Sequence, residues 1–167
     1  MYKVGDHVVY GSHGVCHILD TEERRIDGKT RHFFVLEPSE QPGTKFYIPS
    51  QNPTALAKLR PVMTRLELDT LLSSREARSE GWIEDENQRK QRYRERIVSG
   101  DCAALIRMIS SLHRHRAEQI AAGRKFHMCD ENFLRDAEKI LNAEFAFILG
   151  IAPSEVSAYV AAALQSE

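Results

Sequence analysis

The chain has 167 residues, of which 42% are apolar and 28% charged, and its formal net charge is −1. These values are ordinary for a folded soluble protein and exclude collagen, a low-complexity coil and a strongly basic nucleic-acid tail. The longest apolar runs, such as Phe145 to Ile148, are too short to span a bilayer, and the N-terminus has no secretory-signal pattern. Three widely spaced cysteines, Cys16, Cys102 and Cys129, favour free thiols and a cytoplasmic location.

Residues 2–60 contain short runs rich in Val, Ile, Phe and Tyr, separated by Gly, Pro and Asp, which predicts strands. We expect strands at His7 to Tyr10, Val15 to Thr21, Arg31 to Leu36 and Lys45 to Ile48, with a fifth around Ala57 to Arg60. The pair Asp27-Gly28 predicts a type I′ hairpin turn, in which both central residues have a positive φ. Five short strands in so short a segment predict a small barrel or a strongly bent sheet.

From residue 64 onward the spacing of apolar residues is helical. Thr64 and Glu67 form a capping box, and we expect the helix that it begins to end near Arg78. Further helices are expected over residues 84–98, from a cap at Asp101 to Ala121, from a cap at Asp130 to Gly150, and from Pro153 onward. The sequence therefore predicts an α+β protein, with a five-stranded β domain over residues 1–61 and an all-helical domain of about five helices over residues 62–167.

The charge changes along the chain. Residues 1–60 contain 8 basic and 7 acidic side chains, residues 61–127 contain 13 and 10, and residues 128–167 contain 2 and 7. The middle third is therefore locally basic, which suits contact with phosphate groups. Solvated helix faces of mixed charge give the same pattern, so charge alone does not decide between the two interpretations.

Catalytic and metal-binding motifs are weak. The chain has no glycine-rich phosphate loop and no nucleophile-elbow or HExxH motif. His113, His115, His127 and Cys129 resemble a zinc set only superficially, because the two histidines stand two apart and so lie on different sides of a helix. Cys102, near a helix start, has no obvious acidic or histidine partner. We expect no cofactor, no metal and no enzymatic activity, and a small metal-dependent enzyme is the alternative.

A basic helix follows the only tryptophan. Arg89, Arg92 and Arg96 are spaced to share one face of this helix, Lys90 flanks that face, and Trp82 lies in the loop before it. Such arginines can neutralise DNA phosphates, and an indole can wedge against an unstacked base step in the minor groove. The alternative is that Trp82 packs onto the helical core and the arginines are only solvated.

Basic residues also surround the predicted hairpin turn. Arg24 and Arg25 precede Asp27-Gly28, and Arg31 follows it. This charge density indicates either protection of a sheet edge or a docking surface. On the predicted fourth strand Lys45 and Tyr47 alternate with Phe46 and Ile48, so one of these two pairs is expected to face outward.

An ordered series of motifs closely resembles the bacterial CarD/CdnL family of transcription factors that bind RNA polymerase. The opening motif is Lys3-Val4-Gly5-Asp6-His7-Val8-Val9-Tyr10. The series continues in the same order with Ile26-Asp27-Gly28, Phe34-Val35-Leu36, Ile48-Pro49, Trp82-Ile83, Ser99-Gly100-Asp101 and Asp136 to Leu141. Each motif is short, but together they cover nearly the whole chain.

The resemblance implies a Tudor-like N-terminal domain, also found in the transcription-repair coupling factor, that docks on the polymerase β subunit. It implies a C-terminal helical domain that contacts upstream promoter DNA near the −10 element and supports the open promoter complex without base-specific readout. Carried over to this sequence, Trp82 is the wedge, and the candidates for phosphate contacts are Arg89, Lys90, Arg92 and Arg96.

The resemblance also assigns residues toward the polymerase. Arg24 matches a polymerase-contacting arginine of the family, with Arg25 beside it. Tyr47 stands where some relatives have an arginine, two residues before the motif proline, so we expect the polymerase contact there either to be weaker or to be rebuilt through stacking of Tyr47. We expect a monomer with no membrane partner, although a swapped β domain is compatible with exposed sheet edges. The competing hypothesis is a protein-binding adaptor whose helical domain never touches DNA.

Overall fold

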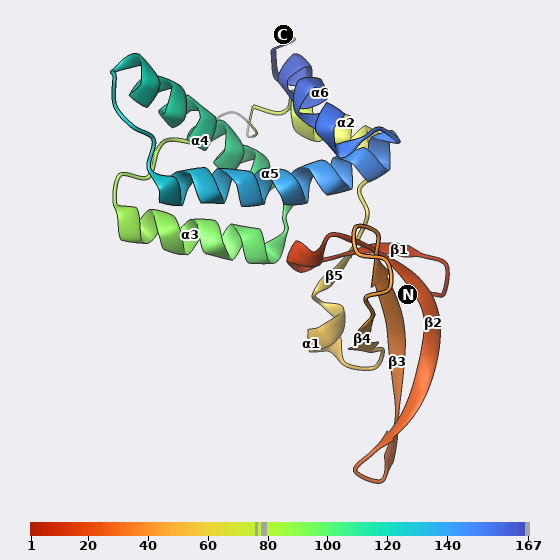
Figure 1. Cartoon of the computed structure of the whole chain (residues 1–167). Coiled ribbons are helices and arrows are strands. Elements are labelled where there is room, and N and C mark those ends of the chain that lie inside the picture. The colour runs from red at the N-terminus through yellow and green to blue at the C-terminus, as the bar shows by residue number, and fades with distance from the viewer. Residues whose placement is uncertain (76, 78–79, 166–167) are drawn as a thin grey trace. The chain divides into compact units, whose positions relative to one another are not determined.

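The computed structural model describes residues 1–75, 77 and 80–165. The chain divides into two compact units, Met1–Val62 and Met63–Glu167, which we call the β unit and the helical unit. The β unit is a five-stranded antiparallel sheet and the helical unit is built from helices, so the fold class is α+β, as predicted (Figure 1).

The β unit contains one sheet with the strand order β4-β3-β2-β1-β5, in which every neighbouring pair is antiparallel. Its strands are β1 (His7–Tyr10), β2 (Val15–Ile26), β3 (Lys29–Pro38), β4 (Phe46–Pro49) and β5 (Leu59–Pro61). The short helices η1 (Gly11–His13) and α1 (Pro53–Leu56) lie in the connections. This is the predicted Tudor-like β domain.

The hairpin of β2 and β3 is longer than predicted. Asp27 and Gly28 have φ values of 50° and 74°, as a type I′ turn requires, and the ladder is paired up to the turn. Residues near the turn are mostly charged and exposed, so no alternation of apolar residues marks them as strand. The tight turn and the ladder hydrogen bonds nevertheless extend both strands, and the hairpin projects beyond the rest of the sheet (Figure 1).

A small apolar cluster stabilises the β unit. Its buried members are Val8, Cys16, Ile18, Phe34, Leu36, Ile48 and Leu59. Burial raises the pKa of the Cys16 thiol to about 11, so this thiol stays protonated at neutral pH. Cys16 is therefore a small apolar core residue rather than a reactive group.

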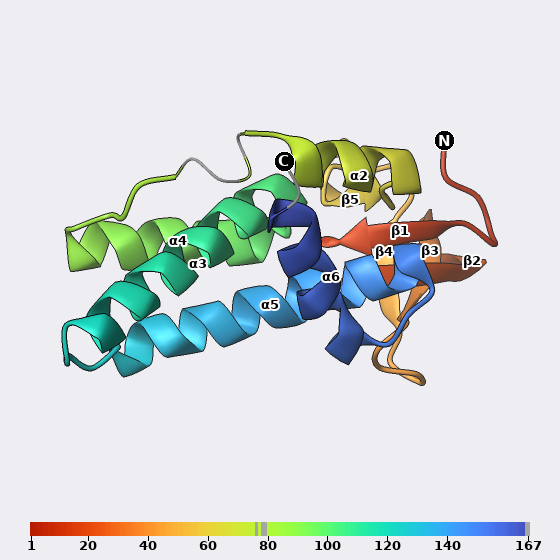
Figure 2. The same cartoon turned by 90° about the horizontal axis from the view of Figure 1, so that it is seen from above.

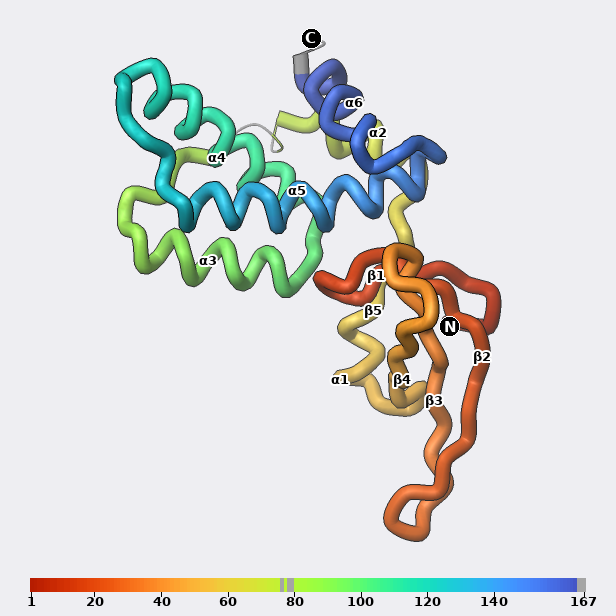
Figure 3. Tube along the Cα trace, viewed as in Figure 1, coloured from red at the N-terminus to blue at the C-terminus, as the bar shows by residue number. Residues whose placement is uncertain are grey.

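The helical unit contains five helices among its described residues: α2 (Arg65–Ser73), α3 (Glu86–Ser99), α4 (Cys102–Ala121), α5 (Met128–Leu149) and α6 (Pro153–Gln165). α3 and α4 run alongside α5, and α6 turns back at its end (Figures 2 and 3). Among the described helices none is long and apolar enough by itself to cross a membrane. α5 and α6 would be long and apolar enough only if taken together, and a bend of 88° separates them.

Four of the local signals for helix ends are confirmed. Thr64 and Glu67 form the reciprocal capping box, and the Asp101 carboxylate accepts a hydrogen bond from the Ala104 amide. Gly100 and Gly150 end α3 and α5 in the left-handed conformation, which glycine adopts without the steric cost of a Cβ atom.

Two predicted helix ends are wrong. α2 ends at Ser73, where the Ser74 hydroxyl donates to the Leu71 carbonyl, and Arg78 lies outside the described residues. α5 begins at Met128 and not at a cap by Asp130, which is buried inside the first turn. Asp130 is buried because its carboxylate pairs with Arg89 on α3.

The stacked pair His7 and His17 predicts a pH-dependent stability. Their ring centroids lie 4.7 Å apart, and burial, together with His17, lowers the pKa of His7 below its ordinary 6.5, although Asp6 opposes the shift. The unfolded chain therefore binds a proton at His7 more readily than the folded protein does. The stability that the folded protein has while His7 is neutral is complete above about pH 6.5 and is lost as the pH falls through the lower pKa of His7 in the folded state. We expect urea denaturation to show a smaller loss of stability between neutral and acidic pH in His7→Gln than in the wild type. An identical pH dependence in the two proteins would contradict this.

Candidate functional site

Two of the predicted polymerase-contacting residues meet on the β unit. The guanidinium carbon of Arg24 lies 4.0 Å from the centroid of the Tyr47 ring, and the Arg24 Nε donates to Glu22 Oε2 at 3.0 Å. All three side chains are partly exposed, so a cation–π contact of about 0.5–1 kcal/mol orients the arginine at the surface. Arg25 follows Arg24 in the same strand and therefore points to the opposite face of the sheet. The structure thus brings Arg24 and Tyr47 together but not Arg25.

Trp82 is half-buried in the segment before α3. Its ring stacks on His115 of α4, with the centroids 3.6 Å apart and the planes at 6°, and the guanidinium carbon of Arg89 lies 4.4 Å from the indole. The His115 Nε2 is 3.0 Å from the Gln119 amide nitrogen, and the Phe126 ring lies 6.2 Å from His115. Trp82 therefore packs against the helical core, as the alternative interpretation predicts, while part of its surface stays accessible to a partner.

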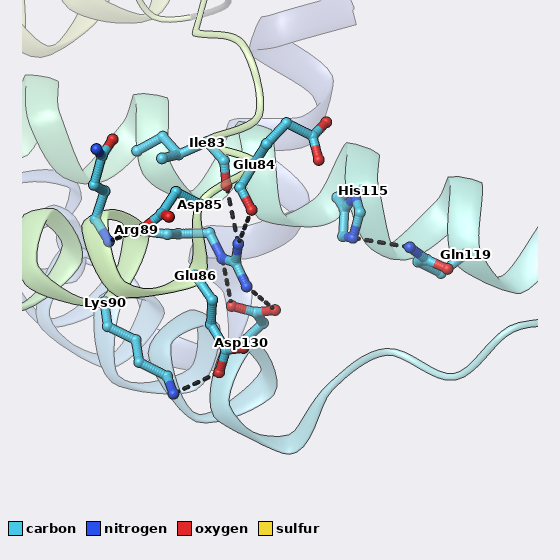
Figure 4. A network of polar contacts seen from close by, with 10 residues as sticks. Ile83, Glu84, Asp85, Glu86, Arg89, Lys90, His115, Gln119 and Asp130 are labelled. Carbon is cyan, nitrogen blue, oxygen red and sulfur yellow. Dashed lines mark hydrogen bonds and ion pairs between the residues drawn. The ribbon is translucent and has the colours of Figure 1, made fainter.

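Arg89 belongs to a buried network rather than to the solvent-facing surface (Figure 4). Its Nε and Nη2 donate to the two carboxylate oxygens of Asp130 at 3.0 and 3.2 Å, and its Nη1 donates to the Ile83 carbonyl at 2.9 Å. Arg89 is 6% exposed and Asp130 is 1% exposed. Arg89 was expected to share a phosphate-contacting face with Arg92, but in the structure Arg89 is buried and Arg92 is exposed.

Arg96 is likewise held inside the unit. Both of its terminal nitrogens donate to the Glu80 carboxylate, each of these two side chains is 14% exposed, and this bond raises the pKa of Arg96. The Arg114 Nη1 donates to the Glu80 carbonyl at 3.2 Å. Arg96 therefore anchors the segment that precedes Trp82 and does not stand free to meet phosphate.

Of the four predicted phosphate contacts on α3, Lys90 and Arg92 are more exposed than Arg89 and Arg96. Lys90 pairs at 2.5 Å with Glu86, one turn earlier, and this pair lowers the pKa of Glu86 and raises that of Lys90. Arg92 is exposed and makes no ion pair with a described residue. Because an exposed pair contributes little free energy, Lys90 can exchange its partner at low cost.

The residues considered for zinc do not form a metal set. His113 pairs with Glu138 at 2.6 Å, while His115 belongs to the Trp82 stack. Over residues 1–75, 77 and 80–165, no group of three or more His, Cys, Asp or Glu side chains is arranged to hold a metal ion. The Cys102 thiol donates a hydrogen bond to the buried Glu144 carboxylate at 2.9 Å. Cys102 therefore has an acidic partner, which the sequence did not indicate.

Glu80, His115 and Asp130 hold Trp82 and its segment, and the sequence indicated this role for none of them. Asp130 lies 41 positions from Arg89, and Glu80 lies 16 positions before Arg96. Helical periodicity pairs only residues three or four apart, so it gives no signal for these partners. The only local indication was that α3 contains four arginines.

Comparison with known families identifies both units. Residues 2–63 match the family model described as the CarD-like/TRCF RID domain, and residues 67–161 match the CarD C-terminal domain. The two matches cover most of the chain, so the protein belongs to the CarD family. The assignment indicates a transcription factor that interacts with RNA polymerase, and CarD-like families are non-enzymatic.

The different surroundings of Arg89 and Arg92 predict different effects on stability. Arg89→Ala leaves the Asp130 carboxylate buried without its partner, so we expect the free energy of unfolding to fall by about 3–5 kcal/mol. Arg92→Ala removes an exposed side chain and is expected to cost about 0.5 kcal/mol or less. Urea denaturation followed by far-ultraviolet circular dichroism measures both values. Equal losses in the two variants would contradict the placement of Arg89.

Proposed function

We propose that the protein docks on the β subunit of RNA polymerase through its β unit and stabilises the open promoter complex through its helical unit. The family assignment supports the polymerase contact in general terms. The observation on which the DNA contact rests is Trp82, a half-buried indole held flat against His115 beside a cationic side chain. No base-specific readout is needed for this function.

The Arg24–Tyr47 pair is the proposed contact with polymerase. Glu22 and the Tyr47 ring hold the Arg24 guanidinium from two sides, so less side-chain entropy is lost when it binds. The aromatic ring adds apolar area beside the charge, a combination that is enriched in protein interfaces. Tyr47 therefore takes part in docking by fixing Arg24 and by offering its own exposed ring.

Trp82 is the proposed contact with DNA at the upstream edge of the melted region, near the −10 element. An apolar side chain placed against an unstacked base step opposes closing of the duplex, whose unstacking costs a few kcal/mol. The stacked indole is already ordered before it meets DNA, so little conformational entropy is lost on contact. The ring acts from its packed position, with its accessible surface toward the DNA.

Exposed cations near this site supply the phosphate contacts. We assign them to Lys90 and Arg92 on α3 and to Arg124 and Lys125 in the loop after α4, which are exposed apart from the partly covered Lys90. Phe126, next in that loop, lies against His115 and so joins the loop to the Trp82 stack. Such contacts make binding sensitive to salt and tolerant of sequence.

Tethering explains how a protein of net charge −1 acts on DNA. Docking on polymerase makes the DNA contact intramolecular and raises its effective concentration, so weak intrinsic affinity is sufficient. The alternative, an adaptor with no DNA contact, is favoured by one observation: Arg89 and Arg96 are neutralised within the unit by Asp130 and Glu80. The next experiment separates the two functions.

Replacement of Trp82 tests the DNA contact. We expect Trp82→Ala to co-purify with RNA polymerase as the wild type does but to shorten the lifetime of open complexes. If the ring supplies about 1 kcal/mol against closing, the lifetime falls on the order of fivefold. Dissociation of preformed open complexes, measured with a competitor, gives this value. An unchanged lifetime would remove Trp82 from the mechanism and favour the adaptor.

Charge reversal of Arg24 tests the docking surface. Arg24→Glu places a carboxylate beside Glu22 and the Tyr47 ring, so we expect co-purification with polymerase to be lost. Arg25→Glu is the matched control, since it makes the same charge change one residue further along, on the opposite face of β2. Retention of Arg24→Glu on polymerase, or an equal loss with Arg25→Glu, would count against the proposed surface.

A further inference from the structure

We infer that Asp130 is a positioning residue for Trp82, acting through Arg89, and that Glu80, bound by Arg96, fixes the other end of the same segment. This inference rests on the proposed function, because it concerns the side chain assigned to the DNA contact. None of the four residues needs to touch DNA. Their role is to hold the segment from Glu80 to Glu84 so that the indole has one orientation when polymerase presents the melted strands.

The Asp130 carboxylate fixes the Arg89 guanidinium in its plane. Both carboxylate oxygens accept from Arg89, a geometry in which two parallel hydrogen bonds define the orientation of the donor. The third nitrogen of Arg89 donates to the Ile83 carbonyl at 2.9 Å. Arg89 therefore links α5 to the backbone of the residue that directly follows Trp82, as Figure 4 shows.

The fixed guanidinium in turn constrains the indole. Its carbon lies 4.4 Å from the Trp82 ring, and His115 stacks on that ring at 3.6 Å. A cation over an indole is attracted by the negative face of the ring, and the attraction is stronger when the pair is partly removed from water. Rotation of the ring away from this position loses both contacts, so the orientation of Trp82 depends on a carboxylate that belongs to a different helix.

A second anchor holds the other end of the segment. The Glu80 carboxylate is bound by Arg96, and the Glu80 carbonyl accepts from Arg114 at 3.2 Å. Gly81 and Trp82 therefore lie between two fixed points, Glu80 and Ile83. A functional side chain on a loop needs this kind of support to keep a reproducible geometry.

Stability alone explains these pairs poorly. A buried ion pair pays a desolvation cost that offsets most of its attraction, and well-packed apolar residues of similar volume are often equally stable or more so. The Arg89–Asp130 pair is 7% and 1% exposed in its side chains. Its position directly beside the Trp82 ring gives it a second role, which is to define where that ring lies.

The experiment uses the full chain with Asp130→Asn, which keeps the shape of the side chain but removes its charge. Trp82 is the only tryptophan, so its fluorescence reports the site without a label. We expect acrylamide to quench Trp82 more strongly in Asp130→Asn than in the wild type. We also expect open complexes to lose lifetime by a factor close to that of Trp82→Ala, with co-purification with polymerase unchanged. Asp130→Asn added to Trp82→Ala is expected to change the lifetime no further.

Two further variants keep the inference testable. Glu131→Gln is the matched control, because it removes a neighbouring carboxylate that makes only a loose 3.8 Å pair with Arg116, and it is expected to leave both readouts unchanged. Arg89→Lys keeps the charge beside Asp130 but loses the planar guanidinium, so we expect the same stronger quenching and shorter open-complex lifetime. This variant replaces Asp130→Asn if Asp130→Asn does not fold.

The two proposals fail in different ways. Unchanged quenching and lifetime in folded Asp130→Asn or Arg89→Lys would overturn the positioning role, whatever Trp82→Ala does. Increased quenching with no loss of lifetime, when Trp82→Ala does shorten it, would also overturn that role. If Trp82→Ala itself leaves the lifetime unchanged, the proposed function fails, and the inference fails with it as a statement about DNA.

Discussion

The buried ion pair of Arg89 and Asp130 is the interaction on which the candidate DNA-contacting site depends. Two charges removed from water require full hydrogen bonding, and here the carboxylate and the Ile83 carbonyl supply it. The same geometry ties α3 to α5 and sets the plane of the cation beside Trp82. The half-buried Trp82 ring thus lies against an ion pair that is itself almost completely buried.

Local chemistry was predictable from the sequence, because its causes lie within a few residues. The capping box at Thr64, the hairpin turn at Asp27-Gly28 and the left-handed Gly100 follow from backbone sterics and short-range hydrogen bonds. Asp130 shows the limit of this reasoning. An acidic residue near a helix start has the appearance of a cap, yet a partner 41 positions away determines its place.

The arginines of α3 show a second limit. Their spacing places Arg89 and Arg96 on one face, but periodicity does not tell which way that face points. A strongly polar helix with few apolar residues gives little indication of its buried side. Here the inward face contains Tyr93 and two arginines, and carboxylates from other segments neutralise those arginines. The family resemblance assigned Trp82 and these arginines to a DNA contact as a prediction, but it did not reveal this internal pairing.

The two units use the same arrangement at different degrees of burial. In each, a carboxylate holds a guanidinium beside an aromatic ring: Glu22 and Arg24 at Tyr47, and Asp130 and Arg89 at Trp82. The first group is partly exposed, so its side chains can adjust to a protein surface at low energetic cost. The second is buried, so the ring has little freedom. In the function proposed for Trp82, which is to oppose closing of a DNA duplex, rigidity is an advantage, because a mobile ring would yield to the two strands.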